Sequence, residues 1–217
     1  MRKIVICSGF AAILLVSCGT PTWAQKTYRP AEVTSATDIP YPIRSIADGI
    51  VIFDVSIDAQ GAVAGLDVIR DVPSLTPAAT SSVSSWKFTP TLAEGILVPS
   101  KIRVAVVFRP RSYFASGPNF TPIASNWEGG AGGGLPGIIS VVYPQYPVNA
   151  VNPGTVVVQV TVGRTGMVRT KTVRDVPPFS RLTLGALGSW RFQPAVLDGK
   201  PTPSNITIAF VFAPLAE

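Results

Sequence analysis

The chain has 217 residues, of which 18 are basic and 12 acidic, so its formal net charge is +6. It contains no histidine and only two cysteines, Cys7 and Cys18. This composition excludes histidine-dependent catalytic triads and histidine-ligated zinc, and the length leaves room for one large domain or two small ones.

Residues 1–24 have the layout of a secretory signal. Arg2 and Lys3 precede an apolar run that is shorter than the roughly 20 apolar residues of a membrane span. Two cleavage positions fit the sequence. The letters LVSC resemble a lipobox, which would end the signal at residue 17 and lipidate Cys18, whereas TWA before Gln25 resembles an ordinary signal-peptidase site. We therefore expect an exported chain in which residues 25–37 form a short N-terminal segment.

Residues 38–109 predict one compact unit. Alternate apolar residues over residues 51–57 predict a strand with one apolar face. The letters DAQG predict a turn, after which a second strand runs back to Arg-Asp-Val-Pro at residues 70–73. Apolar residues at helical spacing predict a helix ending near Trp86, with Thr76 as its N-cap. A last alternating segment ends at Phe108. The order is ββαβ, with one helix on one face of a three-stranded sheet.

Residues 110–141 follow, rich in glycine, proline and serine, and predict a linker. Residues 142–217 then repeat the first unit. Gly61 and Gly166 are 105 positions apart, whereas Trp86 and Trp190 are 104 apart, so the first copy has one extra residue. A β-bulge near Gly65 would accommodate it, because a bulge absorbs one residue and glycine tolerates unusual backbone angles. The sequence therefore predicts an α+β protein of two tandem ββαβ units.

The residue types argue against catalysis. No Gly-x-Ser-x-Gly nucleophile elbow is present, and the glycine run at residues 129–134 lacks the lysine that follows a phosphate-binding loop. We predict no catalytic residue, no cofactor and no metal site. Arg-Asp-Val-Pro has two interpretations: it recognises a ligand, or it forms the turn that ends the strand before the helix. Proline at that junction favours the turn. Trp86 and Trp190 fall on the apolar side of each helical segment, which favours core packing.

Charge is unevenly distributed between the copies. Residues 38–108 hold five basic and seven acidic residues, whereas residues 142–212 hold seven basic and two acidic residues. The positive charge of the second copy is compatible with an anionic partner or with a solvated basic face.

The combined pattern resembles the TonB C-terminal domain family. It includes Tyr-Pro before the first strand of each copy, a hairpin glycine, the helix exit W-[K/R]-F-x-P, and a final alternating strand. The match covers residues 38–109 and 142–213. The resemblance implies a periplasmic binding module without catalytic activity, in which the last strand lies at a sheet edge and pairs with an extended peptide.

The resemblance assigns the partner-binding strands to the last segment of each copy. The second copy is the preferred site, because Lys101 and Arg103 would guard the first against unwanted pairing. The candidate residues are Asn205, Ile206, Thr207, Ile208, Ala209, Phe210, Val211 and Phe212, with Lys101, Ile102, Arg103 and Val104 in the first copy.

The expected partner is an envelope protein or the peptide of an outer-membrane receptor, and no nucleic acid is expected. Three alternatives stay open at this point: a membrane-anchored energy transducer, a module that anchors to peptidoglycan, and self-association through the edges. This chain departs from the pattern of a transducer. A transducer of this family has an uncleaved membrane span that contains a histidine, followed by a long proline-rich spacer, and the present chain has no histidine. Attachment to a membrane would run through a lipid on Cys18.

Overall fold

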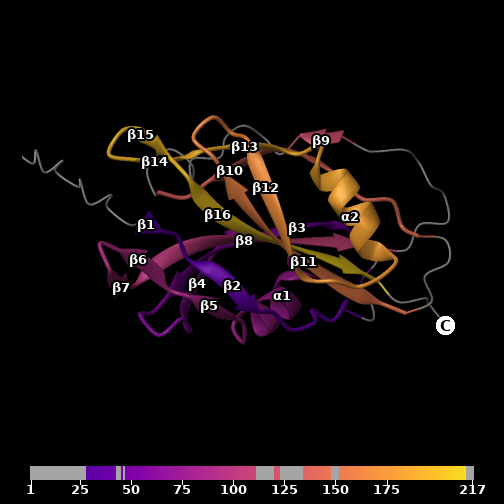
Figure 1. Cartoon of the computed structure of the whole chain (residues 1–217). Helices are drawn as coiled ribbons and strands as arrows, with labels where there is room; N and C mark the ends of the chain where they lie inside the picture. Colours follow the sequence, from indigo (N-terminus) through magenta and orange to yellow (C-terminus); the bar gives the residue numbers. More distant parts are fainter. Residues whose placement is uncertain are drawn as a thin grey trace, which may run out of the picture.

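The computed structural model describes residues 28–42, 45, 47–110, 120–122, 134–147 and 152–213. The predicted signal and Cys18 lie outside the described residues. The centre of the fold is one six-stranded sheet with the order β12-β11-β16-β8-β3-β4 (Figure 1). Its strands are β3 (Gly49–Ile57), β4 (Val63–Arg70), β8 (Ser100–Arg109), β11 (Gly154–Val162), β12 (Val168–Arg174) and β16 (Ser204–Phe212).

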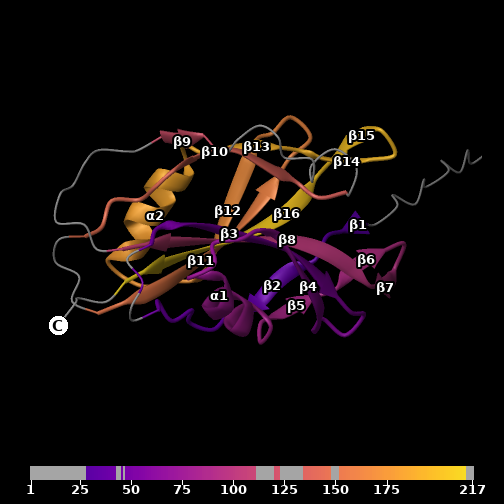
Figure 2. The ribbon, with the colours of Figure 1, turned by 180° about the vertical axis from the view of Figure 1, so that it is seen from behind.

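Each copy supplies three antiparallel strands of this sheet and one helix, which confirms the predicted tandem α+β units. Helix α1 (Thr76–Val83) belongs to the first copy and α2 (Phe179–Leu187) to the second. The two helices lie on opposite sides of the strands (Figures 1 and 2).

The copies join where β8 runs parallel to β16, in a continuous register from Ile206 opposite Arg103 to Phe212 opposite Arg109. Every residue of β16 is buried, and so are seven of the ten residues of β8. The two copies are related by a two-fold axis that runs along the parallel strands β8 and β16. Rotation about this axis turns one face of the sheet into the other. This relation explains why α1 and α2 cover opposite faces.

The extra residue of the first copy is a β-bulge. The pairing of β3 with β4 shifts between Ser56 and Ile57, whose partners are Gly65 and Val63, so Ala64 is the unpaired residue. The prediction of a bulge near Gly65 is therefore confirmed. A second shift, between Ile52 and Phe53, has an equivalent between β11 and β12.

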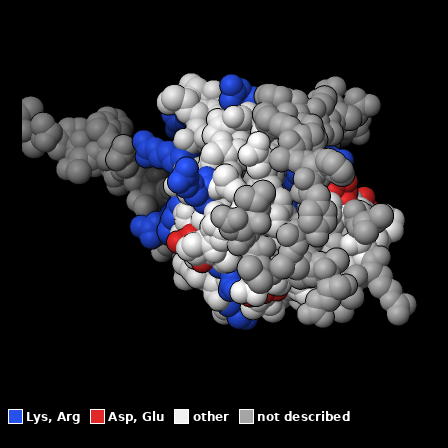
Figure 3. Space-filling view, turned by 90° about the vertical axis from the view of Figure 1, so that its right-hand side faces the viewer, with Lys and Arg blue, Asp and Glu red and all other residues white. Residues whose placement is uncertain are grey.

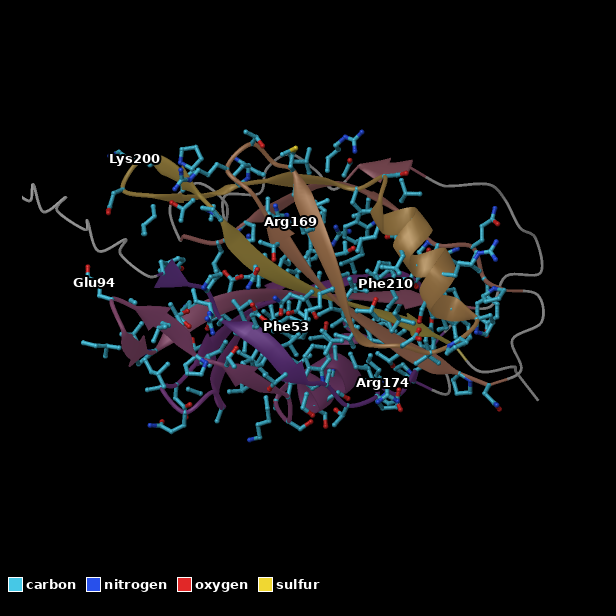
Figure 4. The ribbon with its side chains drawn as sticks, in the orientation of Figure 1. Phe53, Glu94, Arg169, Arg174, Lys200 and Phe210 are labelled. Atoms are coloured by element: carbon cyan, nitrogen blue, oxygen red, sulfur yellow. The ribbon has the colours of Figure 1, made fainter. Side chains whose placement is uncertain are left out.

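Two apolar cores follow from the alternation of the strands. Val51, Phe53, Val55 and Ile57 face α1, as predicted, in a cluster that includes Trp86. In the second copy the even-numbered valines of β11 and the equivalent side chains of β16 face α2 with Trp190. Both tryptophans are buried, so the core-packing interpretation is confirmed. Figure 4 labels Phe53 and Phe210, one from each core.

The predicted helix cap is wrong in detail. Leu75 is the N-cap of α1, and the Thr76 hydroxyl instead accepts a hydrogen bond from the Val72 backbone N–H at 3.0 Å. Ser180 Oγ does the same for Val176 at 2.8 Å. These hydroxyls stabilise the turn between strand and helix, in agreement with the interpretation of Arg-Asp-Val-Pro as a turn that ends the strand.

The segments before each copy contribute short strands. In the first copy β2 (Glu32–Ser35) pairs with β5 (Lys87–Thr89), and in the second β10 (Gly137–Val142) pairs with β13 (Arg191–Gln193). The remaining short strands are β1 (Tyr28–Arg29), β6 (Thr91–Ala93), β7 (Ile96–Val98), β9 (Phe120–Pro122), β14 (Ala195–Leu197) and β15 (Lys200–Thr202). We call residues 28–41 and 134–146 the N-terminal and central arms.

Each arm covers the sheet of the other copy. The N-terminal arm crosses the second copy, where the Val33 and Ile39 backbone N–H groups donate to Gln159 Oε1 and Thr155 Oγ1, each at 3.0 Å. The central arm packs Ile138 and Val141 into one cluster with Ile50 and Ile52 of the first copy. The sequence predicts one helix on one face of each three-stranded sheet, and the structure shows that the opposite face is covered as well, by the arm that precedes the other copy.

Arg103 is the one charged residue that is buried among the described residues. Its side chain is fully buried, its Nε and Nη2 donate to the two carboxylate oxygens of Asp54 at 2.7 and 2.9 Å, and Nη1 donates to the Pro136 carbonyl at 2.9 Å. A buried guanidinium without its carboxylate would keep its charge in an apolar environment, which is strongly unfavourable.

We expect Asp54→Ala to lower the free energy of unfolding by about 3–5 kcal/mol, the usual cost of removing one partner of a buried ion pair. Urea denaturation measures this change. The control is Asp67→Ala, which breaks the exposed pair with Lys101 and should change stability little. Equal effects of the two substitutions would contradict the structural role of the buried pair.

Candidate functional site

The strands predicted to bind a partner lie at the centre of the sheet. Strand β16 pairs with β11 on one side and with β8 on the other, and β8 pairs with β3 and β16. Neither presents an open edge, so the structure corrects that part of the prediction. The physical reason is that the last strand of each copy satisfies its free backbone groups with the last strand of the other copy.

Individual candidate residues have structural partners. Lys101, Arg103 and Asn205 were predicted at the edges, but Lys101 pairs with Asp67, Arg103 with Asp54, and Asn205 Nδ2 donates to the Ala31 carbonyl at 2.9 Å. Ile102 and Val104 face the first core, as do Ala209 and Val211, while Ile206, Ile208, Phe210 and Phe212 face the second. Thr207 is fully buried.

The free edges of the six-stranded sheet are β12 and β4. Each pairs with one strand, β12 with β11 and β4 with β3, and among the described residues no strand is hydrogen-bonded to the outer side of either. An outer strand carries backbone N–H and C=O groups that can accept another chain. The sequence reasoning missed these edges because it treated each copy as a separate sheet.

Strand β12 offers the more regular edge. Its residues from Val168 to Thr172 stay in unbroken register with β11, and the single shift falls beyond Thr172. The strand has no proline and no glycine, and four consecutive residues from Arg169 to Thr172 are exposed. Regular backbone geometry is what a further strand needs to add in register.

The charge of β12 is entirely positive. Arg169 and Lys171 lie opposite Thr161 and Gln159, so both are on the face that the N-terminal arm covers. Lys171 forms an ion pair with Glu32 at 3.3 Å and Arg174 one with Asp38. Among the described residues none pairs with Arg169. Figure 4 shows Arg169 and Arg174 on the same strand, and Figure 3 shows basic side chains gathered at one margin of the molecule.

Strand β4 differs from β12 in shape and chemistry. Two register shifts divide it, leaving four residues from Gly65 to Val68 in unbroken pairing. Val68 and Ile69 are exposed on it, and its charged residues Asp67 and Arg70 are of opposite sign. A bulged edge bends and twists away from a flat partner, so β4 is the poorer acceptor for an added strand.

Aromatic side chains close the end of the sheet where β8 finishes. Arg109 lies 5.0 Å from the centre of the Tyr143 ring, and its guanidinium is 3.9 Å from Asp48. Burial lowers the pKa of Arg109 and raises that of Tyr143. Burial, assisted by Asp48, also raises the pKa of Tyr41 to about 12, so this phenol stays neutral at physiological pH.

The described residues contain no group of three or more acidic, histidine or cysteine side chains that could hold a metal ion. No helix within them is both long and apolar enough to cross a membrane.

Comparison with known proteins gives one match. The model of the family described as Gram-negative bacterial TonB protein C-terminal matches residues 39–110 and again residues 140–214. No curated protein and no solved structure matches the chain. The two matched segments contain the two helices and all six strands of the central sheet.

Hydrogen exchange should distinguish the paired centre from the free edges. Backbone amides of β8 and β16 should exchange among the slowest in the protein, because both strands are buried and bonded on both sides. Alternate amides of β12 should exchange much faster, since every second N–H of an edge strand faces outward. Exchange in β16 as fast as in β12 would show that the two copies separate in solution.

Proposed function

Because the chain belongs to the TonB C-terminal family, we propose that it is an exported envelope protein that binds an extended segment of another envelope protein. The family is one of Gram-negative, envelope-associated interaction domains rather than enzymes. Binding would add the segment as a new strand at an edge of the sheet, where backbone hydrogen bonds supply affinity and alternate side chains supply selectivity.

Export is part of this proposal and depends on the sequence of residues 1–24. The basic start, the apolar run and the two candidate cleavage sites support passage out of the cytoplasm, followed by either a soluble periplasmic chain that begins at Gln25 or one lipidated at Cys18. N-terminal mass determination of the purified protein distinguishes these two forms.

The observation that carries the proposal is the open, regular edge of β12. Five of its residues are in unbroken register, and its outer backbone groups have no strand partner among the described residues. The proposed binding site is therefore β12 and not the predicted strand β16, whose outer side is occupied by β8. The change keeps the predicted mode of binding but moves it to the opposite side of the second copy.

The charge of β12 indicates what kind of segment would bind. Arg169, Lys171 and Arg174 lie on or at the end of the strand, and no acidic residue is among its seven. An added strand with acidic residues facing the N-terminal arm would lie beside Arg169 and gain from that charge, whereas a basic segment would be repelled. We therefore propose an extended partner segment that carries Asp or Glu.

Proline substitution tests the added strand. Neighbouring residues of an edge strand point their N–H groups to opposite sides, so of Thr170→Pro and Lys171→Pro one should block the outer side and the other should break the pairing with β11. A photo-crosslinking residue at Thr172 reports partner capture in the native envelope.

We expect one of the two proline variants to remain folded, by circular dichroism, and to lose the crosslinked envelope protein. The same crosslinker at Val68 on β4 is the matched position on the other edge. Capture that survives in the folded proline variant would overturn strand addition at β12, and an adduct with glycan alone would indicate anchoring to the wall.

Charge reversal tests the chemistry of the partner separately. Arg169→Glu should reduce capture several-fold, and raising the salt concentration should weaken the wild-type interaction in the same direction. Arg181→Glu is the control with the same charge change, because Arg181 is exposed on α2, away from the edge. Equal loss in both variants would point to a general effect of net charge rather than to contact at β12.

A further inference from the structure

The end of the molecule where β8 and β16 begin carries exposed apolar side chains. Because the two strands are parallel, the hairpin turns of both copies meet at this end, together with the start of β1 (Figure 1). We call it the hairpin end and define its apolar surface as Tyr28, Ile96, Leu97, Met167 and Leu197. Figure 4 shows Glu94 and Lys200, from hairpins of different copies, at this same end.

The concentration of apolar surface there is unusual for the molecule. Among the described residues, six large apolar side chains expose more than half of their surface, and five of them are those of the hairpin end. The sixth, Ile139, lies on β10. Single exposed apolar residues are normal on a protein, whereas a group on one surface marks an interaction site.

A groove of about 520 Å³ opens among these hairpins. Its walls are mainly apolar, and polar or charged groups occur only where Glu94, Arg164 and Thr202 reach it. The other lining residues are Tyr28, Pro30, Ala93, Leu197 and Pro203. The groove thus joins the tips of the two copies into one surface rather than leaving two separate apolar loops.

The sequence before Tyr28 suggests what covers this surface. Nine residues separate Cys18 from Tyr28, and even fully extended they span only about 30 Å. A lipid on Cys18, or the apolar run before it, would therefore hold the membrane close to the hairpin end. Two exposed acidic residues, Glu94 and Asp198, lie on these hairpins, and three exposed basic residues accompany the apolar group, namely Arg29 on β1, Arg164 in the turn between β11 and β12, and Lys200 on β15. Such basic residues suit the anionic surface of a bilayer.

We propose that the hairpin end lies against the phospholipid bilayer, with Tyr28, Leu97 and Leu197 in its interfacial region and the strands of the sheet directed away from it. The inference rests on a form of the proposed exported chain that keeps Cys18 or the apolar run before it, and not on strand capture at β12. In this orientation the strands run away from the membrane, so the basic edge of β12 lies at the side of the molecule. A periplasmic segment can reach it there.

Tryptophan substitution tests contact with lipid directly. Leu97→Trp and Leu197→Trp each keep an apolar side chain at a tip, and tryptophan favours the membrane interface. The full chain is reconstituted into vesicles of phosphatidylethanolamine and phosphatidylglycerol with brominated acyl chains, which quench only fluorophores that reach them. Ile69→Trp on β4 is the control, since its exposed side chain lies on a different edge.

We expect brominated lipid to quench most of the emission added by Leu97→Trp and Leu197→Trp, and little of that added by Ile69→Trp. Circular dichroism checks that each variant is folded, and either tip variant alone suffices. Unquenched tips would overturn the proposal, because cover by residues 1–27 or by a second copy gives no contact with bromine. Equal quenching at all three positions would also overturn it, since contact would then not be specific to the hairpin end.

Discussion

The parallel pairing of β8 with β16 is the contact on which the rest of the structure depends. Each copy has about 70 residues, close to the lower limit for an independently stable domain, and ends in a strand with one free side. Joining these free sides closes two edges at once and makes the most apolar strands the centre of one sheet. It also puts the helices on opposite faces and brings all the hairpin turns to one end.

The arms cover the parts of the sheet that this pairing leaves without a helix. A six-stranded sheet with helices on opposite faces leaves half of each face uncovered, and each arm fills the half that lacks a helix. Backbone groups of the N-terminal arm need acceptors there, and Gln159 and Thr155 provide them. On the other side Arg103 donates to Pro136 of the central arm. The buried polar side chains of Gln159, Thr155 and Arg103 are therefore explained by the arms.

The repeat in the sequence was sufficient to predict the two helices and the six strands of the central sheet, and alternation predicted which side chains face each helix. The short strands were not predicted, and β2, β9 and most of β10 fall in the segments expected to be an N-terminal segment and a linker. The extra residue at Ala64 could be located because glycine and spacing marked it. The joining of the copies could not be predicted, because parallel pairing leaves no local pattern and β16 contacts residues a hundred positions away. That the N-terminal arm covers Gln159 could not be predicted for the same reason, since nothing local indicates that an arm will cover a polar residue.

Divergence between equivalent positions indicates that the copies do different work. Asp54 and Arg103 form a buried ion pair in the first copy, where the second has Gln159 and Thr207 at matching positions. The outer strands differ as well, β4 being bulged and of mixed charge, and β12 regular and basic. If duplication had served only to double a binding site, the two edges would be expected to stay alike. The first copy instead closes the edge of the second at β16, which leaves β12 as the open edge of that copy, where we propose that the partner strand adds.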